Sequence, residues 1–387
     1  MTPKTYDPQS KKIILDALLD FNFKDIPETT RFWMIRTKKG YFYEEFLTKN
    51  FAALAWNDIT DSTNFNDLDA LSDRVLINYP EIKRPSLVIN KCKNFIYEVK
   101  SGDILVIPNK GSSIIAFAIA GDYYEDQNKT VEIEHAVIDR IEDKDIVIHE
   151  VNCPYRKRRH IQIVKIISTK GLNRHLYRAI SNYHGISNLD TYSTIILDQL
   201  YNYYTFKTET HIVFNVKKQS PIGLRELAKF LHSVTDILST VVPDENISTQ
   251  LTLESPGNIV LSLQDICKWL ADNYLPLIGA VVFLGGGSFL TVKLPGAVQI
   301  LKDIFTLKID VAKEKAVLTG IELDNLNKQV EIITKLKQAG IDPTTLGHSF
   351  DLLGDCSQSM QIEPTEEFTP SNSIVTEPED DEDEEQL

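Results

Sequence analysis

The stretch at residues 100–108 reads Lys100-Ser101-Gly102-Asp103-Ile104-Leu105-Val106-Ile107-Pro108, a polar turn followed by an apolar run. A short apolar run bounded by turn residues is typical of a buried β-strand. A second such run at Ile114–Ala120 follows the polar turn at residues 109–113. The two runs predict a pair of neighbouring strands, and the rest of the fold is predicted outward from this pair.

Further elements are expected on both sides of the strand pair. Upstream, an aromatic-rich strand is expected at Arg31–Arg36, followed by Gly40 and by an amphipathic helix that ends at residues 53–56. Downstream, a basic cluster at residues 156–160 precedes a strand at Ile161–Ile167. Together these elements predict a small open β-barrel followed by helices, over residues 29–204.

Glycine and aromatic residues at the ends of these strands suggest a site for a flat ligand. Glycine lets the backbone approach a ligand closely, aromatic faces stack on bases, and arginine and lysine neutralise phosphates. The candidate ligand-binding residues are Trp56, Asp103, Gly121, Tyr123 and Tyr124. The candidate phosphate contacts are Arg156, Lys157, Arg158 and Arg159. The alternatives are that Trp33 and Trp56 pack in the core and that the basic cluster is a solvated loop.

The charge of the chain is unevenly distributed. The 387 residues carry a net charge of −14, but the last 27 contain 11 acidic residues and no lysine or arginine. Residues 1–360 therefore carry 41 basic and 44 acidic residues, a net charge of −3. A nearly neutral body neither favours nor excludes a nucleic acid partner.

The cysteines and the N-terminus indicate a cytoplasmic protein. Cys92, Cys153, Cys267 and Cys356 are far apart in the sequence and form no Cys-x-x-Cys pair, so neither zinc ligands nor a disulfide scaffold is expected. Residues 1–12 are polar and lack the apolar core of a secretory signal. We expect buried, inert thiols in the cytoplasm, and association with the inner membrane is the second expectation.

The second half of the chain predicts a separate small module. Residues 1–28 are expected to be a helical lead-in, and residues 208–272 an α+β module. In the latter, a strand at His211–Val216, a helix after Pro221 and two strands around the turn at residues 254–258 give the order β-α-β-β.

An apolar segment and a long helix follow. Residues 274–292 carry no charge and are long enough to span a membrane, although Pro276 and the glycines at residues 285–287 also fit a buried hairpin. A helix within residues 300–340 has Leu323, Leu326 and Val330 at heptad spacing, which fits a coiled coil in a homo-oligomer or an ordinary amphipathic helix. Residues 361–387 are expected to be a disordered acidic tail that could bind a basic partner.

No catalytic motif stands out in the sequence. It contains neither a phosphate-binding loop nor a nucleophile elbow, and its histidines are not paired at metal-ligand spacing. We therefore expect no catalytic residue, no metal and no cofactor. An unrecognised enzyme would require His149, Asp103 and Asp122 to lie close together.

A set of short motifs occurs in a characteristic order. The motifs are Trp33-Met34-Ile35-Arg36, Ala53-Leu54-Ala55-Trp56-Asn57-Asp58-Ile59, Gly102–Pro108, Gly121-Asp122-Tyr123 and Arg158-Arg159 before a strand. In this order, residues 30–204 resemble the PUA/EVE-like barrels at the N-terminus of modification-sensing restriction and phage-defence proteins. The resemblance implies an open β-barrel with a pocket for a modified base or a nucleotide. One departure is Val164-Lys165, which stands where such barrels often have a tryptophan.

Three classes of function remain open at this point. The first is a non-catalytic bacterial sensor in phage defence, whose barrel reads a modified base or a nucleotide. Its output would pass through a membrane-associated or oligomerising C-terminal region. The second is a soluble protein-interaction adaptor with an acidic tail, and the third is the unrecognised enzyme.

Overall fold

The chain has an α+β architecture with two six-stranded sheets. A computed structural model describes residues 8–20, 24–142, 152–170, 172–182, 185–239, 242, 246–251, 257–264, 300, 304, 320–338, 341–342 and 353–363. The chain divides into two compact units: Met1–Phe32, Thr169–Asn182 and Leu189–Thr365 form one, and Trp33–Ser168, Tyr183–Asn188 and Glu366–Leu387 form the other. Each unit is described by itself.

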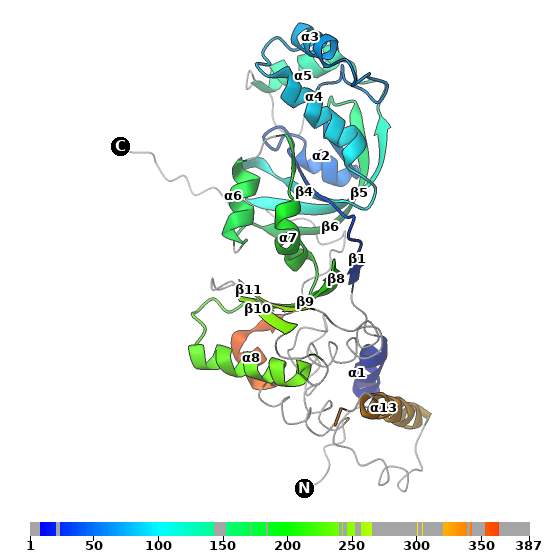
Figure 1. Cartoon of the computed structure of the whole chain (residues 1–387), viewed down its shortest axis with the longest axis vertical. Helices are drawn as coiled ribbons and strands as arrows, with labels where there is room; N and C mark the ends of the chain where they lie inside the picture. Colours follow the sequence, from blue (N-terminus) through cyan, green and yellow to red (C-terminus); the bar gives the residue numbers. More distant parts are fainter. Residues whose placement is uncertain are drawn as a thin grey trace, which may run out of the picture. The chain divides into compact units, whose positions relative to one another are not determined.

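The first sheet curls into a half-barrel (Figure 1). Its strands follow the order β3-β6-β5-β4-β2-β7. The pairs β3–β6, β6–β5, β5–β4 and β2–β7 are antiparallel. The bounds are β2 (Phe32–Ile35), β3 (Phe51–Leu54), β4 (Ile104–Pro108), β5 (Ile114–Glu125), β6 (Lys157–Ser168) and β7 (Ile186–Asn188). The predicted strand pair is therefore confirmed as β4 and β5, with Ile104 opposite Ile119.

Two irregularities interrupt the pairing of β5 with β6. The register shifts between Phe117 and Ala118, and again between Ala120 and Tyr123. Such bulges bend a strand and increase its twist, which helps a sheet to curl. Gly121 lies in the second bulge, where an added Cβ would come 3.1 Å from the Cβ of His160.

Short helices connect and cover these strands. They are α2 (Tyr43–Thr48), α3 (Leu68–Asn78), α4 (Pro85–Lys93), η1 (Asn94–Glu98), η2 (Lys110–Ser112) and α5 (Val131–Glu142). Their apolar sides, including Phe46, Val75 and Phe95, are buried in one core with the strand residues Leu105 and Ile107.

Two local predictions for this unit are wrong. Residues 53–56 do not end a helix, because Phe51–Leu54 forms the fully buried strand β3 and the helix before it ends at Thr48. The basic cluster is not a separate loop either: β6 begins at Lys157, and its residues Lys157–His160 pair with β3. The strand predicted at Ile161–Ile167 is therefore the second part of a longer one.

The second sheet is mixed and belongs to the other unit. Its order is β1-β8-β9-β11-β10, with β12 also paired to β9, and β1 runs parallel to β8. The strands are β1 (Lys24–Ile26), β8 (Tyr203–Phe206), β9 (Glu209–Val216), β10 (Ile247–Leu251), β11 (Gly257–Leu263) and β12 (Ile362–Glu363). Helices of this unit are α1 (Pro8–Asp20), α6 (Arg174–Asn182), η4 (Asp190–Tyr192), α7 (Ser193–Leu200), α8 (Leu224–Leu238) and α13 (Gly320–Gln338).

The predicted β-α-β-β order is confirmed as β9-α8-β10-β11. The sheet is larger than predicted, because β1, β8 and β12 add to it from outside residues 208–272. The lead-in is helical in α1, as expected, but it also contains the strand β1. Ile212 and Phe214 of β9 share a core with Phe230 of α8 and Ile14 of α1.

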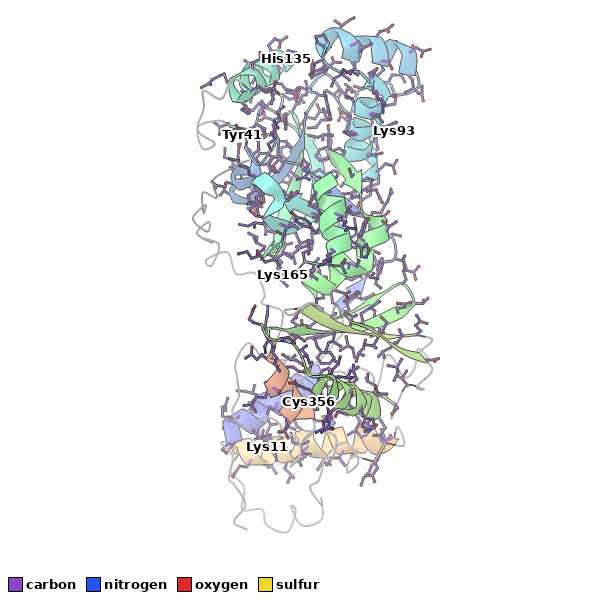
Figure 2. All side chains as sticks on the ribbon, turned by 90° about the vertical axis from the view of Figure 1, so that its left-hand side faces the viewer. Lys11, Tyr41, Lys93, His135, Lys165 and Cys356 are labelled. Carbon is purple, nitrogen blue, oxygen red and sulfur yellow. The ribbon has the colours of Figure 1, made fainter. Side chains whose placement is uncertain are left out.

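Helix α13 is a single long helix, as predicted, but its buried face differs from the expected heptad. Leu323 is 49% exposed, whereas Asn325 and Gln329 are 3% and 1% exposed. Asn325 and Gln329 have hydrogen-bond partners in this buried setting. Asn325 Nδ2 donates to the carbonyl of Pro8, and Gln329 accepts from Lys11 Nζ at 2.8 Å. Figure 2 labels Lys11 on α1, where it meets α13.

Several predictions lie outside the described residues. These are the apolar segment at residues 274–292, Cys267 and most of the acidic tail, of which residues 361–363 are described. Within the described part of the chain, no helix has the length and apolar character needed to span a membrane. Cys92, Cys153 and Cys356 are free and buried, as expected.

Candidate ligand-binding site

The turn after β3 has an unusual backbone. Trp56 adopts a φ of 67°, in the left-handed region that residues other than glycine rarely occupy. This conformation costs a residue with a Cβ about 1–2 kcal/mol. The Trp56 side chain is half-buried. The surrounding structure must therefore hold this tryptophan in a conformation that it would not adopt alone.

Glu134 holds the amide side of the turn. Its carboxylate accepts hydrogen bonds from the backbone N–H groups of Trp56 and Asn57, both at 2.7 Å. It also accepts from the hydroxyl of Tyr79 at 2.8 Å. Glu134 projects from α5 and is 3% exposed. This buried carboxylate therefore holds the backbone N–H groups of Trp56 and Asn57 in place.

Lys157 holds the carbonyl side of the same turn. Its Nζ donates to the carbonyl oxygens of Trp56 at 2.6 Å and Ile59 at 2.9 Å. Lys157 is the first residue of β6 and is fully buried. The peptide groups of residues 56–59 thus lie between a buried carboxylate and a buried ammonium, with their dipoles oriented to satisfy both.

Asn57 completes the support of this turn. Its side-chain NH₂ donates to the carbonyls of Thr130 and Pro154, at 3.0 and 2.9 Å. Its side-chain oxygen accepts from the backbone N–H of Arg156 at 2.8 Å. The amide therefore uses both donors and its acceptor, and it ties the turn to the segments before α5 and β6.

Glu125 fixes the loop that continues from this turn. It accepts hydrogen bonds from the backbone N–H of Asp61, the hydroxyl of Tyr123 and the Nε of Arg156, at 2.7–2.9 Å. Burial alone would raise the pKa of Glu125, but these three donors outweigh it and hold the pKa below its usual value. The pKa of Tyr123, in contrast, is raised, because the side chain is buried and its hydroxyl donates to Glu125.

One cation lies over the Trp56 ring. Lys91 Nζ is 5.8 Å from the ring centroid, within the range of a cation–π interaction. Beside it, Cys92 is buried and its Sγ lies 3.9 Å from the carbonyl oxygen of Ala55. Burial raises the pKa of Cys92 to about 11, so the thiol is protonated at neutral pH and is not an activated nucleophile.

Asp103 and Gly121 have structural partners. Asp103 is 3% exposed and accepts from the indole Nε1 of Trp33 at 3.0 Å and from the backbone N–H of Lys100 at 2.9 Å. It therefore closes the turn before β4 and ties down the buried Trp33. The carbonyl of Gly121 accepts from Arg159 Nη1 at 3.1 Å.

The two candidate tyrosines do not form one stacking surface. They are consecutive on β5, opposite Arg159 and Arg158 of β6, so their side chains point to opposite faces of the sheet. Tyr124 stacks on His160 with centroids 4.5 Å apart, whereas the Tyr123 ring lies 5.6 Å from the guanidinium of Arg159. A single flat ligand could use at most one of these rings together with Trp56.

The four basic candidates make internal contacts. Arg159 is 4% exposed and donates to the carbonyls of Phe95 and Ile96, both at 3.0 Å, in addition to Gly121. Burial lowers its pKa. Arg156 pairs with Glu125 at 2.8 Å, and Arg158 with Asp126 at 3.3 Å. With Lys157 fully buried, these cations organise the turn and the strand ends, and phosphate contact by any of them stays a prediction.

The sequence did not single out Glu134, Asn57, Tyr79 or Lys91 as site residues. One signal for Glu134 is visible in the sequence of α5: Val131, Glu134, Ile138 and Ile141 are spaced as one helix face. An acid among apolar residues on such a face indicates a buried carboxylate with a structural or functional task. Lys91 and Tyr79 carry no comparable signal.

The cluster that an unrecognised enzyme would require stays a prediction, because one of its three members is outside the described residues. Asp103 is buried and Asp122 is exposed, while His149 lies outside the described residues. In the part of the chain that the structure describes, no group of three histidine, cysteine, aspartate or glutamate side chains is placed to hold a metal ion.

Comparison with known proteins adds one match. Residues 33–152 match a family model described as "Domain of unknown function (DUF8426)", and the strands of this domain form the curled half-barrel. The match includes Trp56, Glu125 and Glu134, and ends shortly before Lys157. Neither the curated proteins nor the solved structures contain a significant match.

Proposed function

We propose that the half-barrel is a non-catalytic module that binds a flat ligand, a modified base or a nucleotide, against Trp56. The observation that carries the proposal is the buried support of this one residue by Glu134 and Lys157. Burying a charge costs several kcal/mol unless it is well paired, and a strained backbone persists only where its surroundings over-determine it. Such a cost is reasonable where the position of an aromatic side chain matters for binding.

Lys91 supports the choice of ligand class. An ammonium beside an aromatic ring suits a ligand with both a planar group and a negative charge, which describes a nucleotide or a base within a nucleic acid. The PUA/EVE-like resemblance favours the same class. Output through the C-terminal region, as a sensor in defence against phage, is part of the proposal.

A titration of the full chain tests the proposal. Oligonucleotides with and without modified bases, mononucleotides and cyclic nucleotides are added, and binding is followed by calorimetry. We expect one class to bind and Trp56→Gly to abolish its binding. Glycine removes the ring and tolerates the φ of 67°, so a loss of binding cannot be attributed to added backbone strain.

Two lysines of α4 provide a matched pair. Lys91→Gln removes the charge beside Trp56. Lys93→Gln removes an exposed charge from the same helix, and Lys93 is labelled in Figure 2. We expect only Lys91→Gln to weaken binding. Equal affinity of Trp56→Gly and the unchanged chain for every ligand would rule out the site and leave the adaptor hypothesis.

A further inference from the structure

A continuous basic stretch extends beyond the cluster at residues 156–159. Residues 151–189 contain eight lysines and arginines and no acidic residue. The first four cations make the internal contacts described above. The remaining four, Lys165, Lys170, Arg174 and Arg178, lie farther along the stretch, and two of them belong to α6.

Helix α6 has one buried and one basic face. Leu176 and Ile180 are fully buried and Ala179 is 5% exposed, so the helix is held by its apolar side. The opposite side is exposed and carries Arg174, His175, Tyr177 and Arg178. The helix, shown in green in Figure 1, contains no acidic residue.

The spacing of the exposed residues brings an aromatic ring between two cations. Arg174, Tyr177 and Arg178 are related as i, i+3 and i+4, and therefore lie on one side of the helix. Tyr177 is 42% exposed, so its ring is accessible on the same side of the helix as the two arginines. Cations that neutralise phosphates and an aromatic ring that stacks on a base are the two components of single-strand recognition.

We propose that α6 binds the backbone of single-stranded nucleic acid, with Arg174 and Arg178 on phosphates and Tyr177 stacked on an unpaired base. Charge complementarity favours a polyanion, and the exposed tyrosine favours unpaired bases over a duplex, whose bases are already stacked. The inference is independent of the Trp56 site. It assigns phosphate contacts to the exposed Arg174 and Arg178 of α6.

Fluorescence anisotropy with the full chain tests this surface. The probes are a labelled mixed-sequence single strand without modified bases and the corresponding duplex, each titrated at several salt concentrations. For Arg174→Gln/Arg178→Gln, we expect the slope of log affinity against log salt to fall in magnitude by about 1.4, from about 0.7 for each lost phosphate contact on a single strand. Tyr177→Ala should weaken single-strand binding roughly fivefold or more.

The control removes two charges from another helix. Lys335→Gln/Lys337→Gln changes exposed residues of α13 and should leave both the affinity and the salt slope unchanged. The proposal is overturned if no single strand binds at low salt, if the control weakens binding as much as the α6 variants, or if the duplex binds more tightly. Trp56→Gly should not affect this probe, so failure here and failure of the Trp56 site are distinguished.

Discussion

Glu134 and Lys157 each direct their charge at the backbone of residues 56–59. Removing one partner leaves the other groups unsatisfied in a buried setting, which costs more than the bonds themselves contribute. We expect Glu134→Ala to lower the free energy of unfolding by about 3 kcal/mol or more, measured by urea denaturation. Glu132→Ala, an exposed change on the same helix, should cost less than about 0.5 kcal/mol. Similar losses for both variants would contradict the role assigned to Glu134.

The unit with the mixed sheet also contains a buried carboxyl. Asp198 of α7 is 6% exposed and accepts a hydrogen bond from the Tyr204 hydroxyl at 2.9 Å. Burial raises its pKa from 3.8 to about 7, although the bond from Tyr204 acts in the opposite direction. Between these two values the folded state binds more protons than the unfolded state, so stability falls as the pH rises, by up to about 1.4 kcal/mol for each pH unit.

Asp198→Asn tests this dependence. The asparagine oxygen can still accept from Tyr204, but it carries no charge to desolvate. We expect the variant to lose this part of the pH dependence and to be more stable than the unchanged chain at pH 8, by urea denaturation between pH 4 and 8. Asp236→Asn changes an exposed residue of α8 and should keep the slope. Parallel pH profiles for Asp198→Asn and the unchanged chain would contradict the prediction.

Single residues were predictable from the sequence where their burial follows from a local pattern. Trp33, for which a place in the core was the alternative prediction, is buried. Trp56 was identified as a candidate, but its positive φ and its support depend on Glu134 and Lys157, which are distant in sequence. Asp103 was a ligand-binding candidate, and the structure shows that it accepts a hydrogen bond from the indole of Trp33, a contact between residues distant in sequence.

Two glycines show how the turns of the half-barrel depend on their surroundings. Gly40 and Gly102 both have a positive φ, of 89° and 95°. A Cβ on Gly40 would come 2.5 Å from the backbone nitrogen of Lys110, while a Cβ on Gly102 would meet nothing within 4 Å. Gly40→Ala therefore adds a steric clash to the conformational cost that both substitutions share.

The pair yields a quantitative prediction. We expect Gly102→Ala to lower the free energy of unfolding by about 1–2 kcal/mol through its φ alone. Gly40→Ala should cost about 1–3 kcal/mol more, because the backbone near Lys110 must shift. Chemical denaturation of the two variants measures the difference, and equal losses would show that the approach to Lys110 is unimportant.

Elements were predicted well where the apolar pattern is long or is bounded by clear turns, as in β4, β5 and α8. The error at residues 53–56 arose in a short run, Phe51–Leu54, whose residues are all buried. Periodicity cannot distinguish a helix from a strand in such a run. The buried face of α13 was missed because Asn325 and Gln329 are polar, and their partners on or near α1 lie more than 300 residues away in sequence.

At the scale of the whole molecule, each unit has its own core, which contains Ile107 in one unit and Ile212 in the other. Both side chains are fully buried, and replacing a buried isoleucine by valine typically costs about 0.5–1.5 kcal/mol. We expect calorimetry to show two unfolding transitions, with Ile107→Val lowering one midpoint and Ile212→Val the other. A single transition shifted equally by both variants would contradict separate unfolding of the units.

The pairing of β2 with β7 has a consequence for how the chain folds during synthesis. Strand β1 must wait for β8, since Lys24 pairs with Tyr204, and at about 5–20 residues per second a ribosome needs roughly 10–40 s to make the chain between them. The entropy of closing so long a loop opposes this pairing. Once Trp33 pairs with Asn188, however, Leu189 can donate to the carbonyl of Phe32, and the two ends of the inserted half-barrel become neighbours. Once the insert has folded, only residues 27–32 and 189–202 remain to be closed between β1 and β8, in place of the whole of residues 27–202. The entropy cost of pairing these two strands is therefore lower than the length of the intervening sequence suggests.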